Sequence, residues 1–527
     1  MEMFFHLLKF ILSKRKTLKK YLLLLCTILS ISCYGQKETH FISINQVRED
    51  LNYLDEILRE KSSYQGLNGF DYHKSFDTYL NKIESKDSIS VLEFGLFLSQ
   101  TMGKIGDRHS YIKGYDLPES KYLPMAFAPL DEKVLVLEFD REQEVYKRWH
   151  SEYPYLKSIE QIPINDILSK SIPGEELAPE NSFTLRAVRE LRNIETLFYI
   201  LNKELPNPIS ITLTNEEGEE KLFSIPLVEK DKRPRIWDER YHKKGFFFEF
   251  YEDQINNRKI IEQFFRIDDQ LAYIQIPSMV DRKDSPTFFQ MLGSFMEEAK
   301  NTEALIIDVR DNGGGSRDLI QELAGYLVHP DSIYVVNVTR QRGELPLNNE
   351  LKERLNSRFL FPKSEFEPRE QETINRFIST FEPMYQLNEK NFSENYYYLL
   401  NGKKLSTDKY HFNKPVYILA NERTFSAASI LVSVFKGLPN IKIVGTNTDG
   451  SSGNSERFNL PHSQLDGKIS TMVSFQKDGQ ILDGIGTSPD IRIERNLNQV
   501  YWSEDYQLQK LIELIEEEIK NASSKSN

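Results

Sequence analysis

Residues 304–315 read ALIIDVRDNGGG, an apolar run that passes directly into three consecutive glycines. The apolar part, Ala304–Val309, is typical of a strand that is buried on both faces of a sheet. Glycines after such a strand let the backbone approach a ligand closely, and they expose N–H groups of the kind that form an oxyanion hole. The stretch therefore predicts an α/β fold with a site at the carboxyl end of this strand. A plain turn at a sheet edge is the alternative.

Strands and helices alternate on both sides of this stretch. Further apolar strands are predicted at residues 271–276, 416–420 and 441–444, and helices at residues 287–299, 319–328 and 506–522. This alternation is typical of a mostly parallel sheet that is covered on both faces. The charged residues 343–409 interrupt it and are predicted to form a largely helical insertion or cap. Residues 469–475 are predicted to form one half-buried strand.

Two regions of different character precede the alternating part. Residues 38–115 have helical periodicity, with apolar residues spaced for one face over 47–58 and again over 91–102. Residues 116–230 carry strand patterns, and the strand, turn and helix within 156–168 resemble part of a PDZ-like domain, with another small β-rich insert as the alternative. The predicted units are a helical N-terminal domain (38–115), a PDZ-like domain (116–230), an α/β core (235–500) and a C-terminal helix and tail (501–527).

The first 36 residues have the pattern of a secretory signal peptide. Basic residues over 14–20 precede an apolar run over 21–31 that is too short for a comfortable membrane span, and small residues follow it. We therefore expect export to the periplasm or cell envelope after cleavage near Gly35 or Gln36. Lipidation of Cys33, after Ser32, is the alternative, although Ser30 stands where a lipobox has Leu.

Charge and cysteine content exclude several function classes. A formal net charge of −12 argues against a nucleic-acid partner held by a phosphate-neutralising surface. Loss of residues 1–36, which hold six Lys or Arg and one Glu, would bring this charge to −17. The same cleavage would remove Cys26 and Cys33, the two cysteines of the sequence, and with them thiol catalysis and cysteine metal sites.

A second stretch, KPVYILANERTFSAASI at residues 414–430, is a predicted strand followed by a turn and the start of a helix. Ser426 would lie at the helix start, with its hydroxyl at the carboxyl end of the sheet. The N–H of Ala427 beside it is suited to stabilise an anion. An ordinary N-cap role for Ser426 is the alternative.

A serine hydroxyl is inert unless a base takes its proton, and a carboxylate usually orients that base. His109 stands in a tight turn two residues after Asp107, and Asp483 stands in the glycine-punctuated loop LDGIGTSPD at residues 482–490. These two residues are the candidate base and the candidate carboxylate. A purely structural histidine is the alternative for His109.

Together these stretches resemble the tail-specific (C-terminal processing) serine protease family. Residues 308–315 resemble its glycine-rich oxyanion motif, TFSAA at 424–428 its nucleophile motif, and GIGTSPD at 484–490 its closing Gly-x-Gly-x-x-Pro-Asp signature. The resemblance covers residues 40–500. It implies a ClpP/crotonase-like spiral α/β core behind a helical domain and a PDZ-like domain.

The sequence departs from the family pattern in two places. Where the bacterial processing branch carries a catalytic Lys, residues 445–453 read GTNTDGSSG, and Ser429 stands where the family commonly has Glu. The chain is more similar to the branch of the tricorn core and the interphotoreceptor retinoid-binding protein modules, which uses a His near the end of the N-terminal domain. This resemblance implies a nucleophile, a base, an orienting carboxylate and an oxyanion hole at Ser426, His109, Asp483, and the N–H groups of Gly313 or Gly314 and Ala427.

The resemblance implies an exported serine endopeptidase that acts on protein or peptide substrates through an acyl-enzyme and needs no metal or organic cofactor. The missing Lys keeps a second hypothesis open, a catalytically inactive module that binds a peptide or a hydrophobic ligand on the same scaffold. We also expect an extended substrate to enter between the PDZ-like domain and the core and to pair with the strand at 469–475. The oligomeric state is not predicted.

Overall fold

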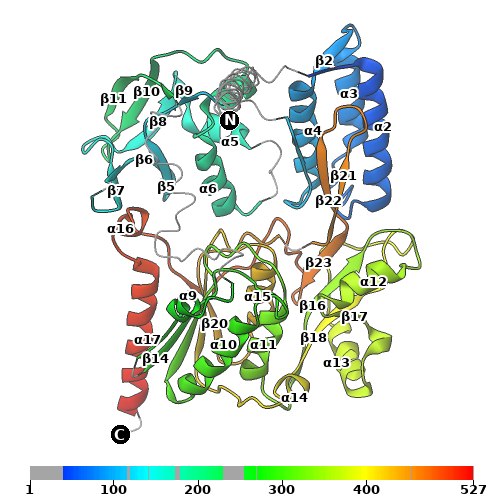
Figure 1. The fold of residues 1–527 in the computed structure, drawn as a ribbon, viewed down its shortest axis with the longest axis vertical. Helices are drawn as coiled ribbons and strands as arrows, with labels where there is room; N and C mark the ends of the chain where they lie inside the picture. The colour runs from blue at the N-terminus through cyan, green and yellow to red at the C-terminus, as the bar shows by residue number, and fades with distance from the viewer. Residues whose placement is uncertain are drawn as a thin grey trace, which may run out of the picture.

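The computed structural model describes residues 40–115, 119–140, 142–172, 178–229, 255–268, 270–451 and 453–525. The signal peptide predicted for residues 1–36 lies outside this part of the chain. Within it, no helix combines the length and the apolar character that a membrane crossing requires. Figure 1 shows an α/β unit below, with a helical region and a β-rich unit side by side above it.

The lower unit is built on a six-stranded sheet with the strand order β13-β14-β15-β19-β20-β24. Its strands are β13 (Phe265–Ile267), β14 (Leu271–Gln275), β15 (Ala304–Asp308), β19 (Val416–Ala420), β20 (Ile441–Gly445) and β24 (Ile491–Arg492). All neighbours pair in parallel except the edge strand β13, which is antiparallel to β14. Every residue of β14, β15 and β19 is buried, which confirms the predicted sheet.

Helices cover both faces of this sheet (Figure 1). One face carries α10 (Pro286–Glu298), α11 (Asp318–Leu327) and α15 (Ala427–Phe435), and the other carries α17 (Tyr506–Lys525). Successive residues of β15 point to opposite faces. Ile307 belongs to the apolar cluster under the first three helices, whereas Ile306 packs with Leu511 of α17.

The N-terminal region consists of α2 (Ile44–Lys61), α3 (Tyr72–Ile83) and α4 (Val91–Ile105), with the short paired strands β1 (Phe41–Ser43) and β2 (Ser88–Ser90). The apolar face predicted over 47–58 is buried in α2. These helices do not form a separate core, because their apolar cluster continues into Val338, Tyr397 and Phe475 from much later in the chain. The region after α4 is tied down as well, since β3 (Tyr111–Lys113) pairs with β22 (Asp466–Ser470), which also pairs with β21 (Ser455–Asn459).

Residues 119–229 form the β-rich unit, with an apolar cluster of their own. Its seven-stranded sheet contains β5 (Ala126–Leu130), β6 (Lys133–Asp140), β7 (Val145–Arg148), β8 (Tyr155–Ile159), β9 (Ile162–Pro163), β10 (Ile209–Thr214) and β11 (Glu220–Ile225). The helices α5 (Ile164–Ser171), α6 (Glu180–Glu190) and α7 (Ile194–Ile200) pack into the same cluster. The strand, turn and helix predicted within 156–168 are present as β8, β9 and α5.

The segment 343–409, predicted to be a largely helical insertion or cap, contains strands as well as helices. This segment holds α12 (Asn349–Asn356), α13 (Pro368–Ile378) and α14 (Gly402–Leu405), but also β17 (Leu360–Pro362) and β18 (Tyr396–Asn401). The two strands join β16 (Ile333–Gln341) and β23 (Met472–Gln476) in an antiparallel sheet. The high overall charge of the segment indicated an exposed insertion, although the apolar and aromatic residues of β18 are buried. In Figure 1, α12 and α13 lie on the opposite side of the molecule from β5–β11, so they do not cap a groove beside the β-rich unit.

The prediction of one half-buried strand at 469–475 is wrong. The chain leaves β22 at Ser470 and begins β23 at Met472, and the two strands belong to different sheets. All five residues of β23 are buried, and its far end is bridged to Ile481. The sequence alternation therefore spans a change of sheet, and β23 offers no exposed edge to a substrate.

Candidate active site

Ser426 directly precedes α15, at the end of the turn that follows β19. Its backbone has φ 55° and ψ −126°, a conformation that non-glycine residues adopt rarely and at a cost. The turn is held in place because Phe425 N–H donates to the carbonyl of Asn312 at 2.9 Å. The Ser426 side chain makes no capping hydrogen bond, so the ordinary N-cap role does not apply.

The glycine loop after β15 packs directly against Ser426. Gly314 has φ +96°, and a Cβ atom on it would lie 2.6 Å from Ser426 Cβ and 2.9 Å from Ala427 N. No side chain fits there, since heavy atoms in contact do not come that close. The loop is braced from below by Met279, whose N–H donates to Gly314 O at 3.1 Å and whose carbonyl accepts from Ser316 N at 2.7 Å. Gly314 thus brings the backbone of this loop directly against the candidate nucleophile, whereas its predicted approach to a ligand stays a prediction.

The candidate oxyanion donors differ in whether their N–H groups already form a hydrogen bond within the protein. The N–H of Gly314 donates to Asn312 Oδ1 at 2.8 Å and is not free in this conformation. The N–H groups of Gly313 and Ala427 have no hydrogen-bond partner among the described residues. Gly313 and Ala427 are therefore the two candidate donors whose N–H groups are not engaged by another described residue.

His109 lies in a turn organised by Asp107. Helix α4 ends at Gly106, which is left-handed with φ 113°. Asp107 Oδ1 accepts from the N–H groups of His109 (2.8 Å) and Ser110 (3.1 Å), and its Oδ2 accepts from Ser110 Oγ at 2.5 Å. Ser470 Oγ donates to the same carboxylate at 2.5 Å. Asp107 therefore fixes the turn that carries His109.

The imidazole of His109 lies beside the nucleophile turn. Its ring stacks on Phe425 with centroids 5.1 Å apart, and both residues line a cavity of about 560 Å³ together with Ser426. We name this space the nucleophile cavity. On its other side, His109 Nδ1 lies 4.0 Å from Asp483 Oδ1 and has no hydrogen-bond partner among the described residues. Folding thus brings the three predicted residues to one place, with Asp483 near the imidazole but not yet bonded to it.

Burial controls the protonation of His109. Removal from water, together with the nearby cations Lys468 and Arg108, lowers the pKa of His109 to about 3, although Asp449 acts in the opposite direction. The imidazole is therefore neutral at neutral pH. This is the form that a general base must have before it takes a proton.

Asp483 is held by a residue that the sequence interpretation missed. Tyr64, in the loop after α2, donates its hydroxyl to Asp483 Oδ2 at 2.7 Å, and both side chains are buried. Burial and the neighbouring Asp483 raise the pKa of Tyr64, so the phenol stays protonated and remains a donor. No motif surrounds Tyr64 in the sequence, so no local signal could have identified it.

Two lysines that follow Ser426 in the sequence, Lys436 and Lys442, would be the nearest alternative bases, but both lie elsewhere. Lys436 is paired with Asp490 at 2.6 Å, and Lys442 is exposed on β20, so neither lines the nucleophile cavity. Lys468, on β22, does line it. Lys468 was not a candidate, because only the pairing of β22 with β3 brings it beside His109.

Asp107, His109 and Asp483 also form the one group of the described residues with a spacing that would suit a metal ion, since their ligand atoms lie within 4.8 Å of one another. Both oxygens of Asp107 already accept hydrogen bonds, and Tyr64 occupies one oxygen of Asp483. The donor set therefore fits a hydrogen-bonded acid–base network better than a metal site.

Part of the chain matches a known protein family. Residues 270–493 match the model described as Peptidase family S41. The chain contains an S41 serine peptidase domain. This S41 domain includes the parallel sheet, Ser426, the glycine loop and Asp483, whereas His109 and Tyr64 precede it in the chain.

Similar proteins extend the likeness beyond the S41 domain. An uncharacterized protein of Chlamydia muridarum (strain MoPn / Nigg) is 26% identical over 117 residues, which are 21% of this chain and 19% of that protein. Two solved structures of mature CPAF, one of them complexed with lactacystin, are 16% identical to this chain and have TM-scores of 0.60. They cover 91% of this chain and 99% and 98% of their own. At this identity the likeness shows the fold, over nearly the whole length.

Proposed function

We propose that the protein is an exported serine endopeptidase with Ser426 as its nucleophile and with His109 and Asp483 as its base and orienting carboxylate. One observation carries the proposal. A serine in a strained backbone, pressed against Gly314, shares a cavity with a buried neutral histidine from more than three hundred residues earlier. A chain without nucleophilic chemistry at Ser426 has no evident need for that strain.

The first chemical step follows from this arrangement. Because Nδ1 of His109 faces Asp483, Nε2 is the atom that takes the proton of Ser426 Oγ as this oxygen bonds to the peptide carbonyl carbon. The imidazolium gains stability as Asp483 closes the 4.0 Å separation. The N–H groups of Ala427 and Gly313 hold the oxyanion, with Gly314 as a third donor if Asn312 releases it.

The second half of the reaction uses the same groups. The proton on His109 passes to the leaving amine as the C–N bond breaks, which leaves an ester on Ser426. Water then attacks the ester carbonyl and gives a proton to His109. The ester bond breaks, and Ser426 recovers its proton. No metal ion or organic cofactor takes part in this proposal.

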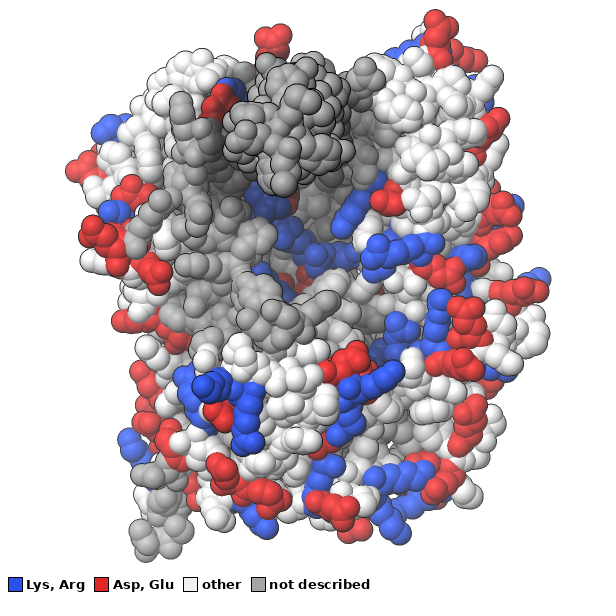
Figure 2. All heavy atoms as spheres, in the orientation of Figure 1, with Lys and Arg blue, Asp and Glu red and all other residues white. Residues whose placement is uncertain are grey.

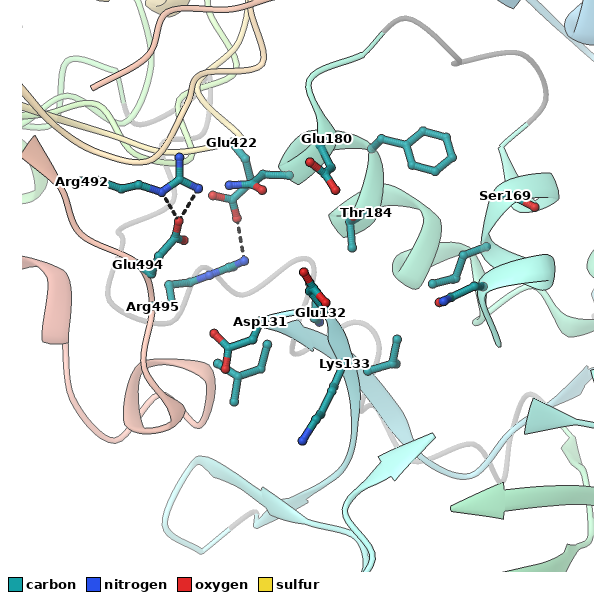
Figure 3. A pocket seen from close by; sticks show the side chains of 17 residues that line it. Asp131, Glu132, Lys133, Ser169, Glu180, Thr184, Glu422, Arg492, Glu494 and Arg495 are labelled. Atoms are coloured by element: carbon teal, nitrogen blue, oxygen red, sulfur yellow. Dashed lines mark hydrogen bonds and ion pairs between the residues drawn. The ribbon is translucent and has the colours of Figure 1, made fainter. Parts of the chain in front are cut away.

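Substrate access is proposed between the β-rich unit and the core. A cavity of about 610 Å³ lies there, and we name it the interdomain cavity (Figure 3). Asp131 and Lys133 approach it from the β5–β6 hairpin, and Glu180 and Thr184 from α6. The core side presents the ion pairs Glu422–Arg495 (2.8 Å) and Arg492–Glu494 (2.5 Å). We propose that the β-rich unit is PDZ-like and that the core is a ClpP/crotonase-like spiral, which would place an extended peptide in this cavity.

A serine-reactive fluorophosphonate tests the proposal. The purified chain should be labelled on Ser426, which peptide mass spectrometry identifies, and should cleave an unfolded protein in the presence of a chelator. The Ser426→Ala chain should do neither while keeping the melting temperature of the wild type. The competing function, an inactive binding module, predicts an unlabelled wild-type chain. Activity that a chelator abolishes and a metal restores would instead favour a metal at Asp107, His109 and Asp483.

We also propose export, on the basis of the basic and apolar pattern of residues 1–36. Mass spectrometry of the N-terminus of the chain recovered from its own cells decides this. Cleavage near Gly35 supports export, and a lipid on Cys33 would add an anchor. A cytosolic chain that still begins at Met1 would contradict the proposal.

A further inference from the structure

Cationic side chains line the nucleophile cavity, although the chain as a whole is acidic, with a formal charge of −12. The lining cations are Arg108, Lys113, Arg189 and Lys468. Among the described residues, the one carboxylate in the lining is Asp107, which is buried and already accepts hydrogen bonds within its turn. Figure 2 shows a central hollow on the face that it displays, with blue side chains gathered in the hollow and red side chains mostly along the outer edges.

Lys468 stands in an unfavourable position for its charge. In the antiparallel pair of β21 and β22 it lies directly opposite Arg457. Like charges in such a pair destabilise a sheet. Neither side chain forms an ion pair with any described residue, and β3 adds Lys113 on the other side of β22. The strands β3 and β22 therefore bring the positive charges of Lys113 and Lys468 to the cavity lining, where the carboxylate of Asp107 offsets only part of the charge at Lys468.

Positive charge reaches the cavity from a second direction as well. Arg108 lies over the ring of Phe425, with the guanidinium carbon 4.7 Å from the ring centroid. Arg108 and Arg186 both pair with the same oxygen of buried Asp449, so one carboxylate serves two guanidinium groups. Arg189, from α6, lines both the nucleophile cavity and the adjoining cavity around Asp449. Both the N-terminal region and the β-rich unit thus contribute cations to the cavity lining, through Arg108 and Arg189.

We propose that this cavity binds a carboxylate of the peptide substrate, so that the enzyme prefers acidic peptides. The carboxylate is either an Asp or Glu side chain near the scissile bond or the free C-terminus of a peptide cut close to its end. Lys468 and Arg189 are the specificity-determining residues, because both line the cavity. Lys468 forms no ion pair with any described residue, and Arg189 pairs through Nε with its neighbour Glu190 at 3.3 Å. This proposal rests on the proposed function, since it concerns the substrate of Ser426.

A bound carboxylate would also act on His109. Lys468 and Arg108 both depress the basicity of this residue in the empty cavity. A negative charge placed between them offsets their field and raises the pKa of His109, because an opposite charge stabilises the imidazolium. An acidic substrate would therefore improve the base that attacks it, and a neutral substrate would not.

Binding to the Ser426→Ala chain tests the carboxylate site separately from catalysis. Four fluorescent peptides of equal length combine a Glu or a Gln near the centre with a free or an amidated C-terminus, and anisotropy reports their dissociation constants. We expect at least one carboxylate to tighten binding about tenfold, as charge-assisted hydrogen bonds do, and the gain to shrink as salt rises. Preference for Glu identifies the side chain as the source, and preference for the free end identifies the C-terminus. Equal binding of all four peptides would overturn the proposal.

Matched variants assign the effect to the cavity. Lys468→Met removes the charge and keeps the apolar stem, and it should weaken the preferred acidic peptide about tenfold while leaving the neutral amidated peptide unchanged. Lys442→Met, on exposed β20 outside the cavity, should change neither. Arg189→Gln is the second variant if Lys468→Met lowers the melting temperature. Equal weakening of acidic and neutral peptides, in whichever of these variants folds, would also overturn the proposal.

Labelling of the wild-type chain keeps the two proposals apart. A chain that prefers acidic peptides but resists the fluorophosphonate would refute catalysis by Ser426 and leave the carboxylate site standing. A chain that is labelled on Ser426 but shows no preference would refute the carboxylate site alone.

Discussion

Tyr64 donates a 2.7 Å hydrogen bond to Asp483, although 419 positions separate the two residues in the chain. Tyr64 follows α2, and Asp483 follows β23, which belongs to the same antiparallel sheet as β16 and β18. The bond occupies Oδ2 of the carboxylate and leaves Oδ1 facing His109 Nδ1 at 4.0 Å. Tyr64 therefore acts as a positioning residue that decides which oxygen the imidazole meets.

Tyr64→Phe should lower kcat about tenfold and leave KM unchanged, because a hydrogen bond to a carboxylate is lost without a change in the cavity surface. Steady-state kinetics on a short peptide measure both constants. Tyr79→Phe is the matched control, since the Tyr79 hydroxyl is buried with no partner among the described residues. Wild-type kcat in Tyr64→Phe would contradict the positioning role.

Gly314→Ala should reduce kcat/KM at least about a hundredfold, because its methyl group would displace Ser426 and Ala427 from their positions. Gly313→Ala should be tolerated, as nothing lies within 4 Å of a Cβ atom there and the backbone N–H is kept. Rates of fluorophosphonate labelling compare the two variants without the need for a good substrate. If both glycines tolerate alanine, the Gly314 contact does not position the nucleophile.

Acid should destabilise the protein through His109. Its pKa is about 3 in the folded state against a usual 6.5, so the unfolded chain binds the proton first as the pH falls. The neutral imidazole therefore contributes stability that is complete above the usual pKa and is lost progressively as the pH drops from there towards 3. Urea unfolding of the wild type and of His109→Gln at several pH values in this window measures it. The stability difference between the two chains should shrink as the pH falls, and parallel curves would contradict the expectation.

Asp449→Asn should lower the free energy of unfolding by about 3 kcal/mol, because it leaves the guanidinium groups of Arg108 and Arg186 without their shared carboxylate in a buried place. Asp77→Asn, on the exposed face of α3, should cost almost nothing. Denaturant unfolding compares the two variants. An equal, small effect of both would mean that the shared ion pair does not hold the N-terminal region, the β-rich unit and the core together.

Thr184→Arg should block the interdomain cavity with a bulky side chain from α6. Cleavage of an unfolded protein should then fall severalfold, whereas cleavage of a short chromogenic peptide, which does not need the full path, should stay near the wild-type rate. Thr373→Arg, at a similarly half-buried position of α13, is the control. Equal loss on both substrates would mean that peptides reach Ser426 by another route.

Sequence patterns correctly predicted those elements that pack against other regular strands and helices. β15 and β19 were recognisable because a strand buried on both faces must be apolar throughout. The strand at 396–401 was missed because its apolar run lies within a highly charged segment, so composition argued for a surface insertion. Residues 469–475 misled because alternation cannot report that a chain changes sheets between Ser470 and Met472.

The sequence by itself determined the α/β core, the serine at the start of a helix and the glycine loop before it. These features depend on local backbone conformation and on burial, and the apolar residues of each buried strand show that burial in the sequence. Only the tertiary structure decided what surrounds the serine. Tyr64, Lys468 and Asp449 have ordinary local contexts, and they matter because β3 pairs with β22 and α6 packs on the core. Electrostatic and hydrogen-bonding partners depend on distance in space, which the order of residues along the chain does not encode locally.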